Sequence, residues 1–189
     1  PKLRYAQAPL SARTEIAIHH SLTTSGSAES FANYHIDTHG WPGCAYAFVI
    51  KKDGTIQHAN DITAITYHVG NSNRFAVGVC LVGDFRTERP TEAQAEALRL
   101  LHAQLVEQLP AYQRTRGHNE YPGYAWKDCP CFDYKAVLAK DAVEPLTEFK
   151  DVKAGAWYEG AIKAASDAGI MNGYPDGTFR PGEPVSRAE

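Results

Sequence analysis

Apolar residues in the first three quarters of the chain follow the periods of strands and helices in turn. Glu15 to His20 is predicted to be a strand, because Ile16 and Ile18 alternate around Ala17. Ala76 to Val82 is apolar almost throughout, which is typical of a strand buried on both faces. The pattern therefore predicts a sheet with covered faces.

A hairpin is predicted between these two strands. Ala45 to Lys52 is rich in aromatic and β-branched residues, and Thr55 to His58 can return beside it. The pair Asp53-Gly54 between them is typical of a tight turn.

Two segments have helical spacing. Ser30 to Thr38 is followed by Gly40, which can end a helix in the left-handed conformation. Thr91 and Gln94 form a capping box, and Pro110 ends the helix that follows. Strands interleaved with helices predict an α/β domain, a mixed β-sheet flanked by helices. The core stripe of the longer helix is Leu98, Leu101, Leu105 and Leu109.

The domain boundaries follow from a change in pattern. We expect the α/β domain to span 1–140 and a linker containing Pro145 to span 141–147. The remaining segment, 148–189, has one short helix with an apolar face and a dense cluster of turn residues. It ends on a capping box at its last four residues, so we expect the natural chain to continue.

Composition narrows the class of protein. Of 189 residues, 43% are hydrophobic, as in an ordinary globular protein. Lys and Arg number 19 against 22 Asp and Glu, so we expect no nucleic acid as main partner. No apolar run approaches the roughly 20 residues of a membrane-spanning helix, so we expect no membrane insertion. The first residue is Pro1, and the export route is left open.

Two histidines and a cysteine are candidates for a metal site. His19 ends the first strand, His118 follows a short strand at Thr115 to Gly117, and Cys129 lies after a turning loop. Three such ligands with an open fourth position are typical of catalytic zinc. His20 and Cys131 are rival ligands at this point, although neighbouring strand residues point to opposite faces.

A set of motifs resembles the zinc-dependent N-acetylmuramoyl-L-alanine amidases of type 2, which include amidase-type bacteriophage lysozymes and peptidoglycan recognition proteins. The resemblance covers nearly all of residues 14 to 138, in the family's order. It rests on Ile16-Ala17-Ile18-His19-His20-Ser21, Tyr46, Phe48-Val49-Ile50, Asp53-Gly54-Thr55, Val77-Gly78-Val79-Cys80-Leu81-Val82-Gly83, His118, Lys127-Asp128-Cys129-Pro130 and Phe132-Asp133.

The resemblance implies a role for each matching residue. The family's zinc ligands fall on His19, His118 and Cys129, and Cys129 is favoured over Cys131 because it precedes proline as in the family pattern. The catalytic tyrosine and lysine fall on Tyr46 and Lys127. Substrate contacts are expected at His68, His20 and Asn71.

The chemistry implied is hydrolysis of an amide. Zinc would activate a water molecule and polarise the carbonyl, while Tyr46 and Lys127 could donate to the oxyanion. Which of the two moves the proton is left open. Glu120, two residues after a ligand, is a weaker rival as general base.

The last segment resembles an S-layer homology repeat, a module that anchors proteins to secondary cell wall polysaccharides. Only part of one repeat is present. The family's binding residues fall on Ser186 and Arg187, and a guanidinium can pair with an anionic sugar group. The resemblance is carried by Phe149-Lys150-Asp151-Val152, Trp157-Tyr158, Ala161-Ile162, Gly169-Ile170, Gly173 to Pro181 and Ser186-Arg187-Ala188-Glu189.

Together these features predict a peptidoglycan hydrolase that acts at the bacterial cell wall, either secreted or phage-encoded and released at lysis. The cofactor expected is Zn, and the partners are peptidoglycan and a secondary wall polysaccharide. The main alternative is a peptidoglycan recognition module that binds without cleaving. A structural zinc with Cys131 as fourth ligand is a third possibility.

Overall fold

The computed structural model describes residues 3–140, 149–152, 156, 158–167, 173–174 and 177–182. The chain divides into two compact units, Pro1–Lys140 and Asp141–Glu189. Each unit is described by itself.

The first unit is built on a five-stranded sheet with the order β3-β2-β4-β1-β5. β3 pairs antiparallel with β2, and every other pairing is parallel, so the predicted mixed sheet is confirmed. Gly54 in the predicted hairpin turn has φ 85°, a conformation open to glycine. The strands are β1 (Glu15–His20), β2 (Phe48–Ile50), β3 (Ile56–His58), β4 (Ala76–Leu81) and β5 (Arg114–Gly117).

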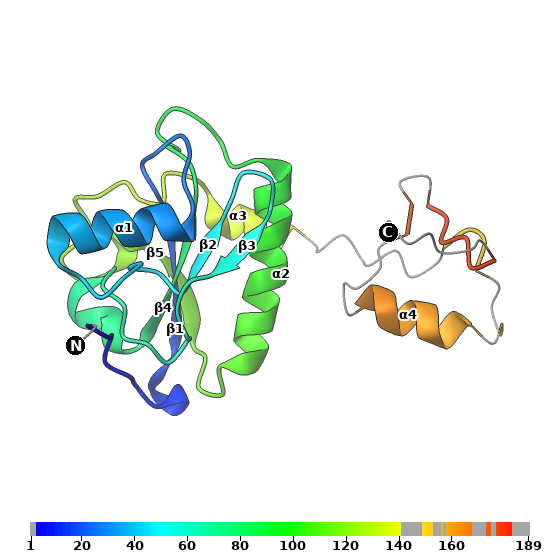
Figure 1. Cartoon of the computed structure of the whole chain (residues 1–189), viewed down its shortest axis with the longest axis horizontal. Coiled ribbons are helices and arrows are strands. Elements are labelled where there is room, and N and C mark those ends of the chain that lie inside the picture. The colour runs from blue at the N-terminus through cyan, green and yellow to red at the C-terminus, as the bar shows by residue number, and fades with distance from the viewer. Residues whose placement is uncertain are drawn as a thin grey trace. The chain divides into compact units, whose positions relative to one another are not determined.

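Helices cover both faces of this sheet. α2 (Glu92–Gln108) and α3 (Tyr134–Ala139) lie on one side, and α1 (Ala28–His39) lies on the other (Figure 1). The capping box of Thr91 with Gln94 and the left-handed Gly40 after α1 are both confirmed. Three short 3₁₀ helices complete the unit: Leu10–Ala12, Gly70–Arg74 and His118–Glu120.

Strand alternation gives the sheet two different faces. Ile16, Ile18 and Val79 pack in one core with the predicted leucine stripe of α2. Ala17 faces the other way, into a smaller cluster with Tyr121. Because the alternation continues along β1, His19 lies on the same face as Ala17, and His20 lies on the same face as Ile16 and Ile18.

The described part of the second unit holds α4 (Glu159–Asp167), which confirms the predicted helix, with Ile162 buried. The Asp151 carboxylate accepts hydrogen bonds from the backbone N–H groups of Phe179 and Arg180. Ser186 and Arg187 lie outside the described residues. Among the helices that are described, none has the length and apolar character needed to cross a bilayer.

Candidate metal centre

Strand pairing brings His19 and His118 together. β1 and β5 run parallel with Ile18 opposite Gly117, so the next residue of each chain segment lies at the same edge of the sheet. The two Nδ1 atoms are 3.1 Å apart, and both side chains are buried. Their rings meet at a centroid distance of 4.6 Å.

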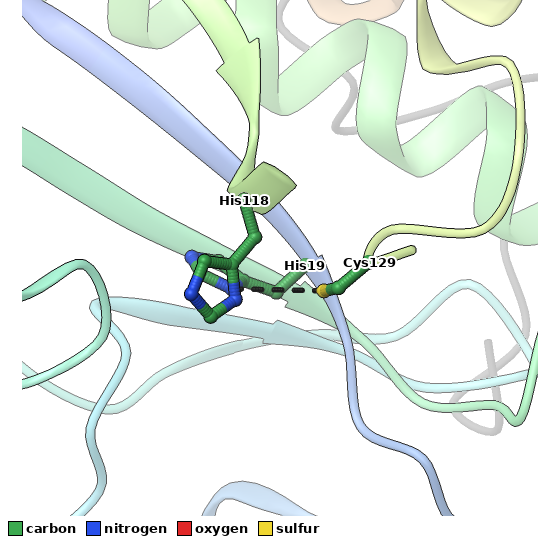
Figure 2. A group of neighbouring side chains, drawn as sticks. All are labelled: His19, His118 and Cys129. Atoms are coloured by element: carbon green, nitrogen blue, oxygen red, sulfur yellow. Dashed lines mark hydrogen bonds between the residues drawn. The ribbon is translucent and has the colours of Figure 1, made fainter. Parts of the chain in front are cut away.

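The loop that carries Cys129 is hydrogen-bonded to the segment after β5, at the same edge of the sheet. The Asn119 backbone N–H donates to the Cys129 carbonyl at 2.9 Å. Gly117 permits close approach of this loop, because a Cβ there would lie 2.7 Å from the Pro130 ring. As a result, Cys129 Sγ lies 3.9 Å from His19 Nδ1, and one donor atom from each of His19, His118 and Cys129 lies within 4.8 Å of the others (Figure 2).

This donor set fits zinc. Zn–N bonds of about 2.0 Å and a Zn–S bond of about 2.3 Å place tetrahedral ligand atoms about 3.3 to 3.6 Å apart. The spacings observed around His19 Nδ1 are 3.1 Å to His118 Nδ1 and 3.9 Å to Cys129 Sγ. Imidazole nitrogen and thiolate sulfur are ligands that zinc prefers. Three protein ligands leave a fourth position for water or substrate, as in catalytic sites.

Burial sets the protonation of the three donors. Desolvation, with the nearby Lys127 charge, lowers the pKa of His118 to about 4, and burial lowers the pKa of His19 well below its ordinary value. Both rings are therefore neutral at pH 7, with lone pairs available. Burial raises the pKa of the Cys129 thiol to about 12, so a divalent cation is needed to hold the thiolate.

Tyr46 and Lys127 lie beside the donors. The Tyr46 ring is 5.2 Å from the His19 ring, and burial raises the pKa of its phenol, so it keeps its proton as a donor. Lys127 Nζ lies 4.8 Å from the ring of Trp126 and 6.0 Å from that of Tyr124. The Tyr124 ring in turn lies 4.5 Å from His118. A hydroxyl and an ammonium thus accompany the cluster.

The three residues expected to contact substrate are placed differently from one another. Asn71 is exposed and lines a groove of about 710 Å³ with Arg74 and Tyr124. His68 is buried, and its Nδ1 lies 3.1 Å from His19 Nε2. His68 thus contacts His19 on the side of the ring opposite to the nitrogen that faces His118 and Cys129.

His20 and Cys131, the rival ligands, form a separate pair apart from the three-donor cluster. His20 Nδ1 accepts the Phe85 backbone N–H at 3.1 Å, and its Nε2 lies 3.7 Å from Cys131 Sγ. His20 is buried on the α2 face and stacked on Phe85, and its expected substrate contact stays a prediction. The three-donor cluster contains Cys129 and excludes Cys131, which removes the basis for a fourth cysteine ligand.

Glu120 is likewise occupied elsewhere. Its carboxylate accepts hydrogen bonds from Lys135 Nζ at 2.6 Å, from the Gly117 N–H at 2.7 Å and from the Tyr134 hydroxyl. Although partial burial opposes it, this set of donors holds the pKa of Glu120 below its ordinary value. These three hydrogen bonds give the carboxylate a structural role, and Glu120 is not among the three donors of the candidate centre.

Arg13 is a buried residue of the fold that the sequence pattern did not indicate. This fully buried side chain donates to four backbone carbonyls between residues 62 and 76, about 50 to 60 residues along the chain from Arg13: Ile62, Ala64, Asn73 and Ala76. Its only signal in the sequence is a charge directly before a buried strand. Backbone acceptors have no side-chain signature, so a residue pattern could not indicate them.

Comparison with known proteins gives concordant results. The family model described as N-acetylmuramoyl-L-alanine amidase matches residues 11–132, and the S-layer homology domain model matches 148–189. The endolysin of Escherichia phage T7 is 38% identical over 109 residues, covering 54% of this chain and 68% of that protein.

Solved structures with the same fold include enzymes and recognition proteins. The endolysin amidase LysCS from Clostridium intestinale superposes with a TM-score of 0.62 at 25% identity, covering 73% of this chain and 91% of that one. Drosophila PGRP-LB gives a TM-score of 0.59 at 24% identity, covering 75% and 88%. The sheet with flanking helices is therefore the fold predicted from the sequence.

Proposed function

Because the chain belongs to the N-acetylmuramoyl-L-alanine amidase family, we propose that it hydrolyses the amide bond between N-acetylmuramic acid and L-alanine in peptidoglycan. The observation that carries the proposal is the convergence of three buried donors, from His19, His118 and Cys129, at the edge of the sheet. These residues would hold zinc. Recognition of the wall without cleavage would need no such donor set.

The chain's own residues supply the rest of the chemistry. When bound, zinc supplies a Lewis acid and lowers the pKa of a water molecule. We assign to Lys127 and Tyr46 the stabilisation of the negative charge that develops on the carbonyl oxygen. Lys127 would act as a cation, and Tyr46, whose phenol keeps its proton, as a hydrogen-bond donor. His19 and His118 stay neutral and keep their lone pairs available.

The stem peptide has a groove in which to lie. The groove lined by Asn71, Arg74 and Tyr124 is linked to the donors through Tyr124, whose ring centroid lies 4.5 Å from that of His118. Exposed Arg74 offers a cation to peptide carboxylates, and Asn71 offers an amide to the peptide backbone. We assign this groove to the peptide side of the scissile bond.

A direct assay tests the reaction. The full chain is incubated with purified peptidoglycan, and new amino termini are counted with chelator, without it, and after zinc is added back. We expect stem peptides that begin with free L-alanine, loss of their release with chelator, and recovery with zinc. Binding to peptidoglycan with no released amine in any metal would contradict the proposal and favour a recognition module.

The S-layer homology region holds the protein at the cell wall, and we propose that its partner is an anionic secondary wall polysaccharide. Arg187 and Ser186 are the residues carried over from the family pattern, and both lie outside the described residues. The Arg187→Ala protein should sediment less with whole walls, with unchanged cleavage of soluble muropeptides. Two results would contradict this partner. In one, Arg187→Ala and the wild type sediment equally with whole walls; in the other, the substitution lowers sedimentation by the same amount when the walls have been stripped of the polysaccharide.

A further inference from the structure

Both ring nitrogens of His19 are engaged, on opposite sides of the ring. Nδ1 faces His118 and Cys129, whereas Nε2 lies 3.1 Å from Nδ1 of His68. The two rings meet edge to face, with centroids 5.1 Å apart and an interplanar angle of 82°. A second histidine therefore stands behind the ligand, on the side away from the other two donors.

The hydrogen bonds that link His19 to His68 continue to a backbone carbonyl, which can only accept a hydrogen bond. His68 Nε2 lies 3.3 Å from the carbonyl oxygen of Ala76. A carbonyl has no proton to give, so His68 Nε2 carries the hydrogen and its Nδ1 is an acceptor in the neutral ring. His19 Nε2 must then carry a hydrogen and donate it to His68. His19 Nδ1 is left with a bare lone pair, directed at the donor cluster.

The surroundings of His68 hold its ring in this position. Gly78 of β4 lies under the ring, and a Cβ there would come within 3.1 Å of three ring atoms. The backbone N–H groups of His68 and Val69 both donate to Asn73 Oδ1, at 3.0 and 2.7 Å. The Ala76 carbonyl is itself fixed by Arg13 Nη2 at 2.6 Å.

We propose that His68 is a positioning residue: it accepts the His19 Nε2–H and thereby fixes the His19 tautomer whose Nδ1 is free to bind the metal. The inference rests on the proposed zinc centre and adds to it a residue that touches neither metal nor substrate. His118 has a different support, since the ring of Tyr124 packs against it at 4.5 Å. The two histidine ligands are thus held in different ways.

The test uses the full chain and two substitutions at one position. His68→Asn keeps an oxygen acceptor near the place of Nδ1, whereas His68→Leu removes the acceptor and stays apolar. The matched control is His102→Leu, because half-buried His102 also makes a ring-nitrogen hydrogen bond, 2.8 Å to Thr115 Oγ1, but lies on α2.

Two readouts need no peptidoglycan. Long-range ¹H–¹⁵N NMR on metal-free protein reports which nitrogen of His19 carries the hydrogen, and competition with a chromophoric chelator gives the zinc dissociation constant. We expect the Nε2–H tautomer in the wild type and in His68→Asn, and its loss in His68→Leu. The His68→Leu dissociation constant should rise about 10- to 100-fold, as when second-shell partners of metal ligands are removed. His102→Leu should match the wild type.

Two results would overturn the proposal: a wild-type His19 with its hydrogen on Nδ1, or a His68→Leu protein with unchanged tautomer and zinc affinity. If His68→Leu fails to fold, the proposal is still tested by the His19 tautomer in the wild-type spectrum and by the zinc affinity of His68→Asn. A protein that passes both tests but releases no amine from peptidoglycan would contradict the proposed hydrolysis alone.

Discussion

Two histidine–cysteine pairs lie on opposite faces of β1, which supplies the histidine of each, and only one pair belongs to the candidate metal centre. Cys129 Sγ is 3.9 Å from His19, and Cys131 Sγ is 3.7 Å from His20. Adjacent strand residues point to opposite faces, so the two pairs are separated by the strand itself. Residue types and spacings are nearly the same in the two pairs, and their surroundings are not.

The surroundings decide which pair can hold a metal. On the His19 side, β5 delivers His118 as a third donor, and His68 occupies the far nitrogen of the ring. On the other side, His20 Nδ1 is taken up by the Phe85 N–H, and no third metal-binding side chain joins the pair in the part of the chain that the structure describes. A metal site is thus made by convergence of three elements, and a His–Cys pair alone does not define one.

The largest expected effect is on zinc affinity, when the cysteine of each pair is replaced in turn. Cys129→Ser removes one of three ligands, so zinc affinity should fall by more than the roughly 100-fold that loss of a supporting residue can cost. Cys131→Ser changes a thiol that faces His20 and should leave the affinity within about twofold. Chelator competition on both proteins measures the difference. A larger loss in Cys131→Ser than in Cys129→Ser would reverse the ligand assignment.

The next effect separates chemistry from metal binding on the His19 side. Tyr46→Phe and Lys127→Met each remove one donor near the developing oxyanion, so kcat should fall about 100-fold or more. The zinc dissociation constant should stay as in the wild type, because neither side chain is a ligand. Tyr34→Phe, on an exposed tyrosine of α1, is the matched control and should keep its kcat.

A loss of zinc equal to the loss of activity would contradict this division. It would mean that Tyr46 or Lys127 supports the ligands and has no direct part in the reaction. Steady-state kinetics on a soluble muropeptide, with bound zinc measured on the same samples, distinguishes the two.

Local signals in the sequence were sufficient for the strands and helices that carry the site. The bounds of β1 were predicted to the residue, and the capping box at Thr91 places the start of α2. Strand alternation also indicated that only one of His19 and His20 could reach a metal. These features depend on neighbours along the chain, and a residue pattern records such neighbours directly.

Features that depend on pairing across the sheet were not predictable in the same way. The substrate contact expected at His68 stays a prediction, whereas its contact with His19 and its place against Gly78 were not predicted. The hydrogen bonds that occupy Glu120 and Arg13 come from distant segments or from backbone atoms. Such contacts depend on tertiary placement, which composition and periodicity do not contain.

A pH titration of stability sharpens the comparison, because three histidines lie on one side and one on the other. In the metal-free fold, burial lowers the pKa of His68 to about 3 and that of His118 to about 4, and it lowers the pKa of His19 and His20 as well. In the unfolded chain all four return to about 6.5. Between these values the unfolded chain binds more protons, so stability is complete above pH 6.5 and is lost as pH falls.

Each such histidine lowers the free energy of unfolding by about 1.4 kcal/mol for each pH unit between its unfolded-state pKa and its folded-state pKa. Urea unfolding of chelator-treated protein should therefore give free energies that fall steadily from pH 6.5 to pH 4. His118→Gln should reduce the slope by the contribution of one proton, about 1.4 kcal/mol per pH unit. A flat profile over this range would contradict the neutral state of the buried rings.

The smallest effect on zinc is expected from His20, the counterpart of His19 on the other face. In His20→Leu, the buried backbone N–H of Phe85 loses its acceptor, which should lower the free energy of unfolding by about 1 to 3 kcal/mol. Zinc affinity and kcat should remain at wild-type values below the unfolding transition, because the strand separates this ring from the donors. A His20→Leu protein that binds zinc weakly while still folded would mean that the two faces are coupled through β1, and that the two pairs act together.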